Sequence, residues 1–325
     1  METLLLTGDD FAALVSMDDC IAAVEQAFRE YGEGRLHAGI LSAHAERGAF
    51  HIKTSTFGRY FAAKLNANFP SNPSANGLPS IQGVIVLVDA TNGFPVAILD
   101  SIEVTVQRTA AATAVAAKYL ARRDSRTATI VGCGRQGVAQ LTALTRVLPI
   151  ERVNAIDADA ERAEKYAASM SERLDLEVRA ATTIEPSDVL ITCTPSKQAF
   201  VRELAPGTFV AAVGADNPEK SEIDPEAMHK SVVVADVLEQ CATIGDLRVA
   251  IAAGVMSRDD VRAELGAIVA GRATGRRSDD ETIIFDSTGA GFQDAAAAAM
   301  AYERAVERGI GLRIPLSPRT GRGLG

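Results

Sequence analysis

Three glycines in the stretch A-T-I-V-G-C-G-R-Q-G-V-A-Q-L, namely Gly132, Gly134 and Gly137, form a G-x-G-x-x-G loop. The loop follows a predicted strand and opens a predicted helix, the context in which this motif binds a dinucleotide. The first glycine permits the tight turn, the second lets the pyrophosphate approach the backbone, and the third lets helix and strand pack. The helix N-terminus offers N–H groups to the anion. Arg135 and Gln136 lie inside the loop and complete this part of the predicted cofactor site.

The next predicted strand, R-V-N-A-I-D, ends at Asp157. An acidic residue at this place in such a fold meets the adenosine ribose hydroxyls. A carboxylate there repels a 2′-phosphate, and residues 158–160 add no arginine to bind one, although Arg162 could fold back. The sequence therefore favours NAD(H) over NADP(H) as cofactor.

A lone carboxylate, Asp216, stands in the loop V-G-A-D-N-P-E-K at the end of an apolar run, after a similar loop T-C-T-P-S-K at 192–197. A carboxyl group can give a proton when it is neutral and take one when it is ionised. By itself, Asp216 in an Asp-Asn-Pro sequence is more typical of a turn. Whether it does chemistry depends on what the fold brings near it.

Two regions of the chain, which differ in predicted secondary structure, would position these residues. Up to about residue 120, the sequence predicts a capped helix from Ser16 to about Gly34, a mostly antiparallel sheet with a hairpin at Asn92-Gly93, and an Ala-rich helix from Glu103 to about Arg123. From 121 to 299, short Val/Ile-rich strands alternate with helical segments, which is typical of a parallel doubly wound sheet. The Ala-rich segment 294–308 predicts a tightly packed helix.

Composition narrows the class of protein. The 325 residues are 47% apolar and 23% charged, the net charge is −9, and basic residues are scattered, so nucleic acid and anionic membranes are poor partners. No apolar run approaches the roughly 20 residues that span a bilayer. The four cysteines are far apart, and no basic region precedes an apolar N-terminal segment, so we expect a reduced, cytoplasmic protein. The four histidines lack metal-ligand spacing, and no metal is expected.

The chain resembles the ornithine cyclodeaminase/mu-crystallin family, which includes alanine dehydrogenases of that fold and ketimine reductases. The matching pieces, in family order, are K-L-N-A-N-F-P-S-N-P (64–73), Q-R-T-A-A-A-T-A-V-A-A-K-Y-L-A-R (107–122), the glycine loop, T-C-T-P-S, V-G-A-D-N-P-E-K-S-E-I-D (213–224) and F-D-S-T-G (285–289). The resemblance implies an α/β protein with a Rossmann-type parallel sheet in 121–299. It also implies a second α+β domain in 1–120, completed by 300–325, that binds substrate and forms a homodimer, with the active site in the cleft between the domains.

The resemblance assigns roles to individual residues. Lys64 and Arg108 match the residues that bind the substrate carboxylate, a role for which a planar guanidinium and a point-charge ammonium are suited. Asp216 matches the catalytic aspartate beside the substrate nitrogen. The loop that lies against the dinucleotide and the turn near the nicotinamide correspond to Thr194, Pro195 and Ser196, and to Ser287 and Thr288.

The sequence departs from the family pattern at two places. Most members carry an arginine upstream of the lysine that corresponds to Lys64. Counted back from Lys64 without gaps, that position is Ile40 in this chain, and the nearest arginine, Arg47, is out of register. A Glu and a Met of the next strand are replaced by His51 and Lys53, which share one strand face because side chains alternate. In ornithine-cyclising members the Glu contacts the distal amine, so its replacement disfavours a cationic substrate. Lys53 either binds a second carboxylate or substitutes for the missing arginine, and His51 either joins it or is structural.

These observations predict an enzyme that uses NADH to reduce a small anionic α-imino acid to an L-amino acid. Iminosuccinate, giving aspartate, is the sharpest expectation. Alanine formation from pyruvate and ammonia, or reduction of a cyclic ketimine such as pyrroline-2-carboxylate, follow closely. A redox-neutral cyclodeaminase is disfavoured by the absent Glu, and a non-catalytic mu-crystallin-like binding protein by the retention of Asp216.

Overall fold

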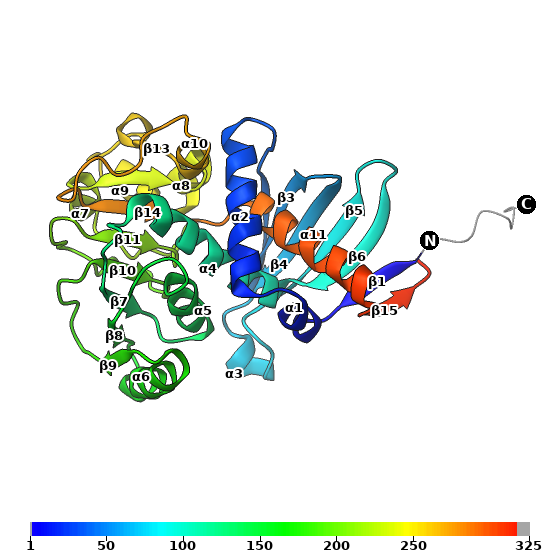
Figure 1. The fold of residues 1–325 in the computed structure, drawn as a ribbon, viewed down its shortest axis with the longest axis horizontal. Helices are drawn as coiled ribbons and strands as arrows, with labels where there is room; N and C mark the ends of the chain where they lie inside the picture. Colours follow the sequence, from blue (N-terminus) through cyan, green and yellow to red (C-terminus); the bar gives the residue numbers. More distant parts are fainter. Residues whose placement is uncertain (1, 317–325) are drawn as a thin grey trace, which may run out of the picture. The chain divides into compact units, whose positions relative to one another are not determined.

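The computed structural model describes residues 2–316, and the chain divides into two compact units. The first unit comprises the described residues up to 27, residues 34–108, and the described residues from 290 onward. The second comprises residues 28–33 and 109–289. Each unit is built on one sheet (Figure 1). None of the helices within residues 2–316 is both long and apolar enough to cross a membrane.

The sheet of the first unit has the strand order β15-β1-β6-β5-β4-β3-β2. Its strands are β1 (Thr3–Leu6), β2 (Gly39–Ala45), β3 (Gly48–Phe57), β4 (Tyr60–Asn68), β5 (Ile81–Asp89), β6 (Phe94–Asp100) and β15 (Leu312–Ile314). Every pair is antiparallel except β1 with β6. The predicted hairpin at Asn92-Gly93 is confirmed: Gly93 has φ 76° and its N–H donates to the Asp89 carbonyl, which closes the turn between β5 and β6.

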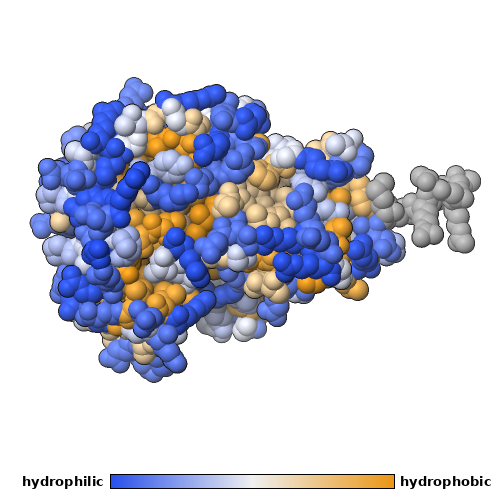
Figure 2. Space-filling view, viewed as in Figure 1, coloured by the Kyte–Doolittle hydropathy of each residue, from blue (hydrophilic) through white to orange (hydrophobic). Residues whose placement is uncertain are grey.

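The helices α1 (Gly8–Leu14), α3 (Asn72–Asn76) and α11 (Gly291–Arg308) belong to the first unit, while α2 (Met17–Gly32) and α4 (Ser101–Leu120) contribute residues to both. α11 packs on β3 and β4 and runs along their sheet (Figure 1). α11 and β3 come so close that a Cβ on Gly291 would lie 2.5 Å from the Thr54 carbonyl oxygen. The alanine run 295–299 is buried, whereas Glu303 and Glu307 of the same helix are exposed. Figure 2 shows a hydrophilic band in the region of α11.

The second unit is built on an eight-stranded, wholly parallel sheet, so the predicted fold class is confirmed. The order is β13-β12-β14-β11-β10-β7-β8-β9. The strands are β7 (Thr127–Val131), β8 (Arg152–Ile156), β9 (Glu177–Ala180), β10 (Val189–Thr192), β11 (Phe209–Ala212), β12 (Val232–Ala235), β13 (Ala263–Glu264) and β14 (Ile283–Asp286). The helices are α5 (Arg135–Leu144), α6 (Ala160–Leu174), α7 (Pro225–His229), α8 (Leu238–Ile244), α9 (Asp246–Ala252) and α10 (Leu265–Val269). β10, β11 and β14 are buried at every residue, as strands covered on both faces must be.

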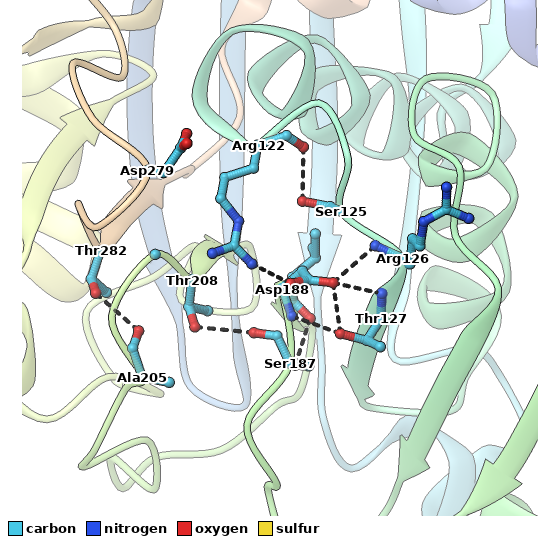
Figure 3. A network of polar contacts seen from close by, with 12 residues as sticks. Arg122, Ser125, Arg126, Thr127, Ser187, Asp188, Ala205, Thr208, Asp279 and Thr282 are labelled. Carbon is cyan, nitrogen blue, oxygen red and sulfur yellow. Dashed lines mark hydrogen bonds and ion pairs between the residues drawn. The ribbon is translucent and has the colours of Figure 1, made fainter.

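Asp188 joins two strands at the amino edge of this sheet, as Figure 3 shows. Its Oδ2 accepts hydrogen bonds from the backbone N–H groups of Arg126 (2.8 Å) and Thr127 (2.9 Å) and from Thr127 Oγ1 (2.8 Å), and its Oδ1 accepts one from Arg122. Partial burial acts to raise the pKa of Asp188, but these donors hold it below its ordinary value. The carboxylate therefore ties the start of β10 to the start of β7.

Replacing Asp188 with Ala should lower the free energy of unfolding by about 2–3 kcal/mol, because several donors lose one charged acceptor. Urea unfolding at pH 7 measures this. Because the folded pKa lies below the unfolded one, the contribution is present above about pH 4 and lost as pH falls, so wild type and variant should converge at low pH. Glu185→Ala, which removes an exposed partner of Arg179, is the control and should cost less than about 1 kcal/mol. An equal cost for both variants would contradict the role of Asp188.

Candidate active site

Five loops with predicted site residues leave the same edge of the parallel sheet. Adjacent strands in the order β14-β11-β10-β7-β8 all end there, because parallel strands point the same way. The loops carry, in that order, Ser287 and Thr288, then Asp216, then Thr194, Pro195 and Ser196, then Gly132 to Gly137, and finally Asp157. The chain order reverses between β10 and β7, and ligands bind in such sheets at the carboxyl edge beside this reversal.

The glycine loop has the shape that a dinucleotide requires. Gly132 has φ 108°, and a Cβ there would lie 2.9 Å from the Cys193 carbonyl oxygen. A Cβ on Gly137 would lie 2.1 Å from the Gly132 carbonyl oxygen, so this glycine lets α5 pack against the turn. Gly134, the N-cap of α5, has nothing within 4 Å of an added Cβ and is exposed together with Arg135. The loop thus presents open backbone at the helix N-terminus, which fits a pyrophosphate.

Asp157 stands where a ribose carboxylate is expected, one residue beyond β8. Its Oδ2 accepts from the Cys133 N–H at 2.9 Å, and its Oδ1 accepts from the Asp159 N–H at 3.0 Å. Arg162 does fold back, since its Nη1 lies 3.3 Å from Asp157 Oδ1 and its Nη2 3.5 Å from Asp159. Asp157 therefore binds the glycine loop and lies beside a cation that is paired with carboxylates.

Asp216 follows β11 in a loop that leaves its side chain 45% exposed. Lys220 Nζ lies 2.7 Å from Asp216 Oδ1, and the Asp216 N–H donates to the Gly214 carbonyl at 3.1 Å. The side chain is thus accessible and has a cation beside it. An accessible carboxyl at this edge of the sheet is placed to exchange a proton with a small molecule.

Glu222 lies beneath this edge and connects two of the loops. Its Oε1 accepts from the Thr194 N–H and Oγ1, both at 2.7 Å, and its Oε2 accepts from Thr192 Oγ1 at 2.8 Å and the Gly214 N–H at 2.9 Å. The residue has no exposed surface, and this burial raises the pKa of Glu222 to about 7 despite the donated hydrogen bonds.

Asp236 plays a similar part under the Ser287–Thr288 turn. It accepts from Ser287 Oγ and Thr288 Oγ1, each at 3.2 Å, and from the Gly289 N–H at 2.6 Å. Asp236 is itself fully buried, so the turn is held from below by a carboxylate.

Within residues 2–316 no group of three His, Cys, Asp or Glu side chains is arranged to hold a metal ion.

The first unit contains a second cluster of predicted site residues. Lys64 on β4 and Arg108 on α4 meet at Asp294 of α11. Lys64 Nζ lies 2.9 Å from Asp294 Oδ1 and 2.8 Å from Oδ2, and Arg108 Nε donates to Oδ1 at 2.9 Å. Arg108 Nη1 also donates to Gln293 Oε1 at 2.8 Å. All three charged side chains are at most 5% exposed, so two buried cations share one buried carboxylate.

This burial controls the charges. Removal from water lowers the pKa of Lys64 to about 7, although the nearby Asp294 acts to raise it. Burial acts to raise the pKa of Asp294, but the charges of Arg108 and Lys64 hold it below its ordinary value. Asp294 is therefore ionised, and Lys64 changes its charge close to neutral pH.

Strand register sets the surroundings of Lys64. Lys53 on β3 is directly opposite Lys64, and Ile40 on β2 is directly opposite Lys53, so all three occupy one row of the sheet. Lys53 is 8% exposed. His51 lies on the same face two residues along, and its Nδ1 is 2.9 Å from Ser42 Oγ. The position at which the family arginine was expected thus faces Lys53 across the strand pair.

Several carboxylates have structural roles that the sequence does not indicate, among them Asp294, Glu222 and Asp236. The sequence predicts only a packed Ala-rich helix around Asp294, although it is the one acidic residue in the apolar stretch 287–302. Glu222 belongs to the motif that carries Asp216, but the residues around it in the sequence do not indicate that it accepts hydrogen bonds from Thr194 and Gly214. A lone acid in an apolar segment is a usable signal, because burial of an unpaired charge is costly. For Glu222 we find no comparable signal.

Known proteins resemble this chain over its length. The model of the ornithine cyclodeaminase/mu-crystallin family matches residues 1–309. An archaeal alanine dehydrogenase dimer with bound NAD is 37% identical, covering 98% of this chain and 100% of that one, with a TM-score of 0.95. Thermococcus litoralis Δ1-pyrroline-2-carboxylate reductase, in complex with NADH and L-proline, is 34% identical over 95% and 99% of the two chains, with a TM-score of 0.91. Paracoccus denitrificans iminosuccinate reductase, in complex with NAD+, is 28% identical over 97% and 100%, with a TM-score of 0.89.

Proposed function

This chain belongs to the ornithine cyclodeaminase/mu-crystallin family, and on that premise we propose that it is an NADH-dependent oxidoreductase that reduces an α-imino acid to an L-amino acid. The observation that carries the proposal is the buried cluster of Lys64, Arg108 and Asp294, in which two cations share one carboxylate. The surplus positive charge suits a substrate carboxylate. The solved relatives that bind NAD or NADH and act on alanine, pyrroline-2-carboxylate or iminosuccinate support the same reaction class.

The residues divide the work as follows. The glycine loop and the α5 N-terminus hold the pyrophosphate, and Asp157 holds the ribose hydroxyls. Bound NADH supplies the hydride that adds to the imine carbon. Arg108 grips the substrate carboxylate through parallel hydrogen bonds, while Lys64 adds a point charge. Asp216 gives a proton to the imine nitrogen as the C=N bond becomes a C–N bond, so that the product is the amine.

For the substrate we propose iminosuccinate, which would give aspartate. Lys53 shares a row with Lys64, so a second carboxylate would meet a second cation on the same sheet face. Alanine formation from iminopropionate and reduction of pyrroline-2-carboxylate are the alternatives; in both, Lys53 would serve the single α-carboxylate. A cyclodeaminase reaction is less well supported, because His51 and Lys53 favour an anionic substrate. A non-catalytic binding role is less well supported, because such a protein needs no accessible Asp216.

A panel of oxo acids with ammonia tests the proposed reaction. NADH consumption is followed with oxaloacetate, pyruvate, glyoxylate and preformed pyrroline-2-carboxylate, each at several concentrations. We expect oxaloacetate with ammonia to have the highest kcat/KM. If oxaloacetate is inert while pyruvate or the cyclic imine turns over, the dicarboxylate assignment is wrong. If no imine oxidises NADH, the enzymatic proposal is wrong.

Replacing Lys53 with Met separates the two roles of this lysine. If Lys53 binds a second carboxylate, the variant should raise KM for the dicarboxylic substrate by about 10-fold or more, since a hydrogen bond to a charged group contributes about 1.5–3 kcal/mol. KM for pyruvate with ammonia should change little. An equal rise for both substrates would place Lys53 on the shared α-carboxylate. Steady-state kinetics with both substrates at one pH provides the comparison.

We also propose a homodimer formed through the uncovered face of the first unit's sheet. Leu41, Leu65 and Val84 lie in one row across β2, β4 and β5, on the face opposite Lys53 and Lys64, and are 63%, 42% and 41% exposed. An apolar row of this kind is typical of an interface. The dimeric alanine dehydrogenase supports this assembly, and sedimentation at micromolar concentration tests it.

The cysteines form no disulfide in the described part, consistent with the cytoplasmic location we propose.

A further inference from the structure

Glu222 accepts hydrogen bonds from two loops, the one at Thr194–Ser196 and the one that carries Asp216. The proposed reaction requires these loops to hold fixed positions relative to each other. One backbone N–H, from Thr194, reaches Oε1, and another, from Gly214, reaches Oε2. Thr194 begins the loop expected against the cofactor, and its Oγ1 accepts from the Ser196 N–H at 3.2 Å. Gly214 lies two residues before Asp216, and its carbonyl accepts from the Asp216 N–H. A single carboxylate thus fixes both loops at the base.

The backbone that carries the Glu222 side chain is held by a second buried carboxylate, that of Asp246. Asp246, at the start of α9, accepts at Oδ1 from the Glu222 N–H (2.8 Å), the Ile223 N–H (3.2 Å) and Ser221 Oγ (3.0 Å). On the other side, a Cβ on Gly214 would lie 2.4 to 2.5 Å from the Glu222 carboxylate atoms. Only a glycine at 214 lets the loop come this close. The backbone of Glu222 and the loop it holds are therefore both fixed in place.

We propose that Glu222 is a positioning residue that aligns the cofactor loop at Thr194–Ser196 with the loop that carries Asp216. The inference rests on the proposed function for the roles of these two loops. Glu222 lies beneath the loops and is fully buried, so it acts through them and does not touch substrate. Glu222 thereby fixes the position of Asp216, the proposed proton donor, relative to the cofactor loop at Thr194–Ser196.

The role requires a carboxylate in particular. In Glu222→Gln, one oxygen is replaced by an NH2 group, which donates and cannot accept. Because the two backbone N–H groups reach different oxygens, either orientation of the amide directs its NH2 at one of them. The Thr192 and Thr194 hydroxyls can rotate to accept, but a backbone N–H cannot. The substitution must therefore release one of the two loops.

The test compares Glu222→Gln with a matched control, Asp188→Asn. Asp188 also accepts from two backbone N–H groups and a threonine hydroxyl, but at the opposite edge of the same sheet. NADH affinity is measured by protein–nucleotide fluorescence, kcat at saturating substrates, and folding by circular dichroism. In Glu222→Gln we expect the Kd for NADH to rise or kcat to fall by about 10-fold or more, because misplacing a reacting group by about 1 Å can cost about 100-fold in rate. In Asp188→Asn both should stay within about twofold while stability falls. Equal small effects in the two variants would overturn the proposal.

A second measurement does not depend on a folded variant or on turnover. In the wild-type protein, hydrogen exchange of the Thr194 and Gly214 amides should be at least about 100-fold slower than that of the amide of the exposed residue Lys197, because both are bonded to a buried acceptor. Fast exchange at either amide would overturn the proposal. If instead no imine substrate oxidises NADH, the enzymatic assignment fails while exchange and NADH affinity still decide whether Glu222 fixes the loops.

Discussion

Asp216→Asn should lower kcat by about 10²- to 10⁴-fold, the range that removal of a general acid or base costs. Asparagine has nearly the same shape as aspartate but neither releases nor accepts a proton at neutral pH. The loop should persist, because its Gly214 N–H bond to Glu222 does not involve the Asp216 side chain. NADH affinity should therefore stay within about twofold of wild type. Stopped-flow NADH oxidation and a fluorescence titration measure the two quantities.

Glu219→Gln is the matched control for that variant. Glu219 lies three residues further along the same loop, is 73% exposed and pairs with Lys197 at the surface. Removing its charge should leave kcat within about twofold, since exposed pairs contribute little. A full rate in Asp216→Asn would remove this residue from the mechanism. A parallel loss of NADH affinity would mean that the substitution had disturbed the loop rather than the proton transfer.

The second unit was predictable because its signals are local. The strands β7, β10, β12 and β14 are short and rich in Val and Ile, and the glycine loop sits between a strand and a helix within fourteen residues. Parallel pairing then places every strand end, and hence every following loop, at one edge without further information. On this basis the loops at 192–197 and 213–220 are expected at the same edge, whereas the roles of Ser287 and Thr288 came from the family resemblance.

The edges of both sheets were not predicted, for a physical reason. β2 is exposed along most of its length, so it has no buried apolar face that would mark it as a strand of this sheet. The edge strand β15 pairs with β1, which comes from the opposite end of the chain, so its place depends on contacts that no local pattern records. β13 has two residues only. Such strands are specified by their neighbours rather than by their own sequence.

The candidate site was predictable only in part. Lys64, Arg108 and Asp216 were found through motifs, but the carboxylates that hold them or their loops were not. Asp294 is 230 residues from Lys64 and 186 from Arg108 in the chain, and Glu222 is 28 from Thr194. Buried polar partners are chosen by geometry, and that geometry exists only after folding. The sequence shows which residues can do chemistry more readily than which residues hold them.

Asp294→Asn should have the largest effect on stability. The substitution leaves Lys64 and Arg108 buried beside a neutral amide, and removal of one partner from a buried ion pair costs about 3–5 kcal/mol. Near pH 6, Lys64 of the wild-type protein is charged and its ion pair with Asp294 is present, so the cost should be large there. Near pH 9 it should be smaller, because the pKa of Lys64 is about 7 and the amine can lose its proton. Urea unfolding at both pH values gives the difference.

The same variant should change how substrate binding depends on pH. Asp294 acts to raise the pKa of Lys64, so its removal lowers that pKa further below 7. Substrate binding through Lys64 needs the ammonium, so KM should rise with pH in wild type through about pH 7 and begin to rise at lower pH in the variant. Gln293→Leu removes only a neutral acceptor from Arg108 and should cost about 1.5–3 kcal/mol without moving the KM profile. A variant Asp294→Asn as stable as wild type at pH 6 would show that the two cations do not depend on this carboxylate. An unchanged KM profile would show that the substrate carboxylate does not bind through Lys64.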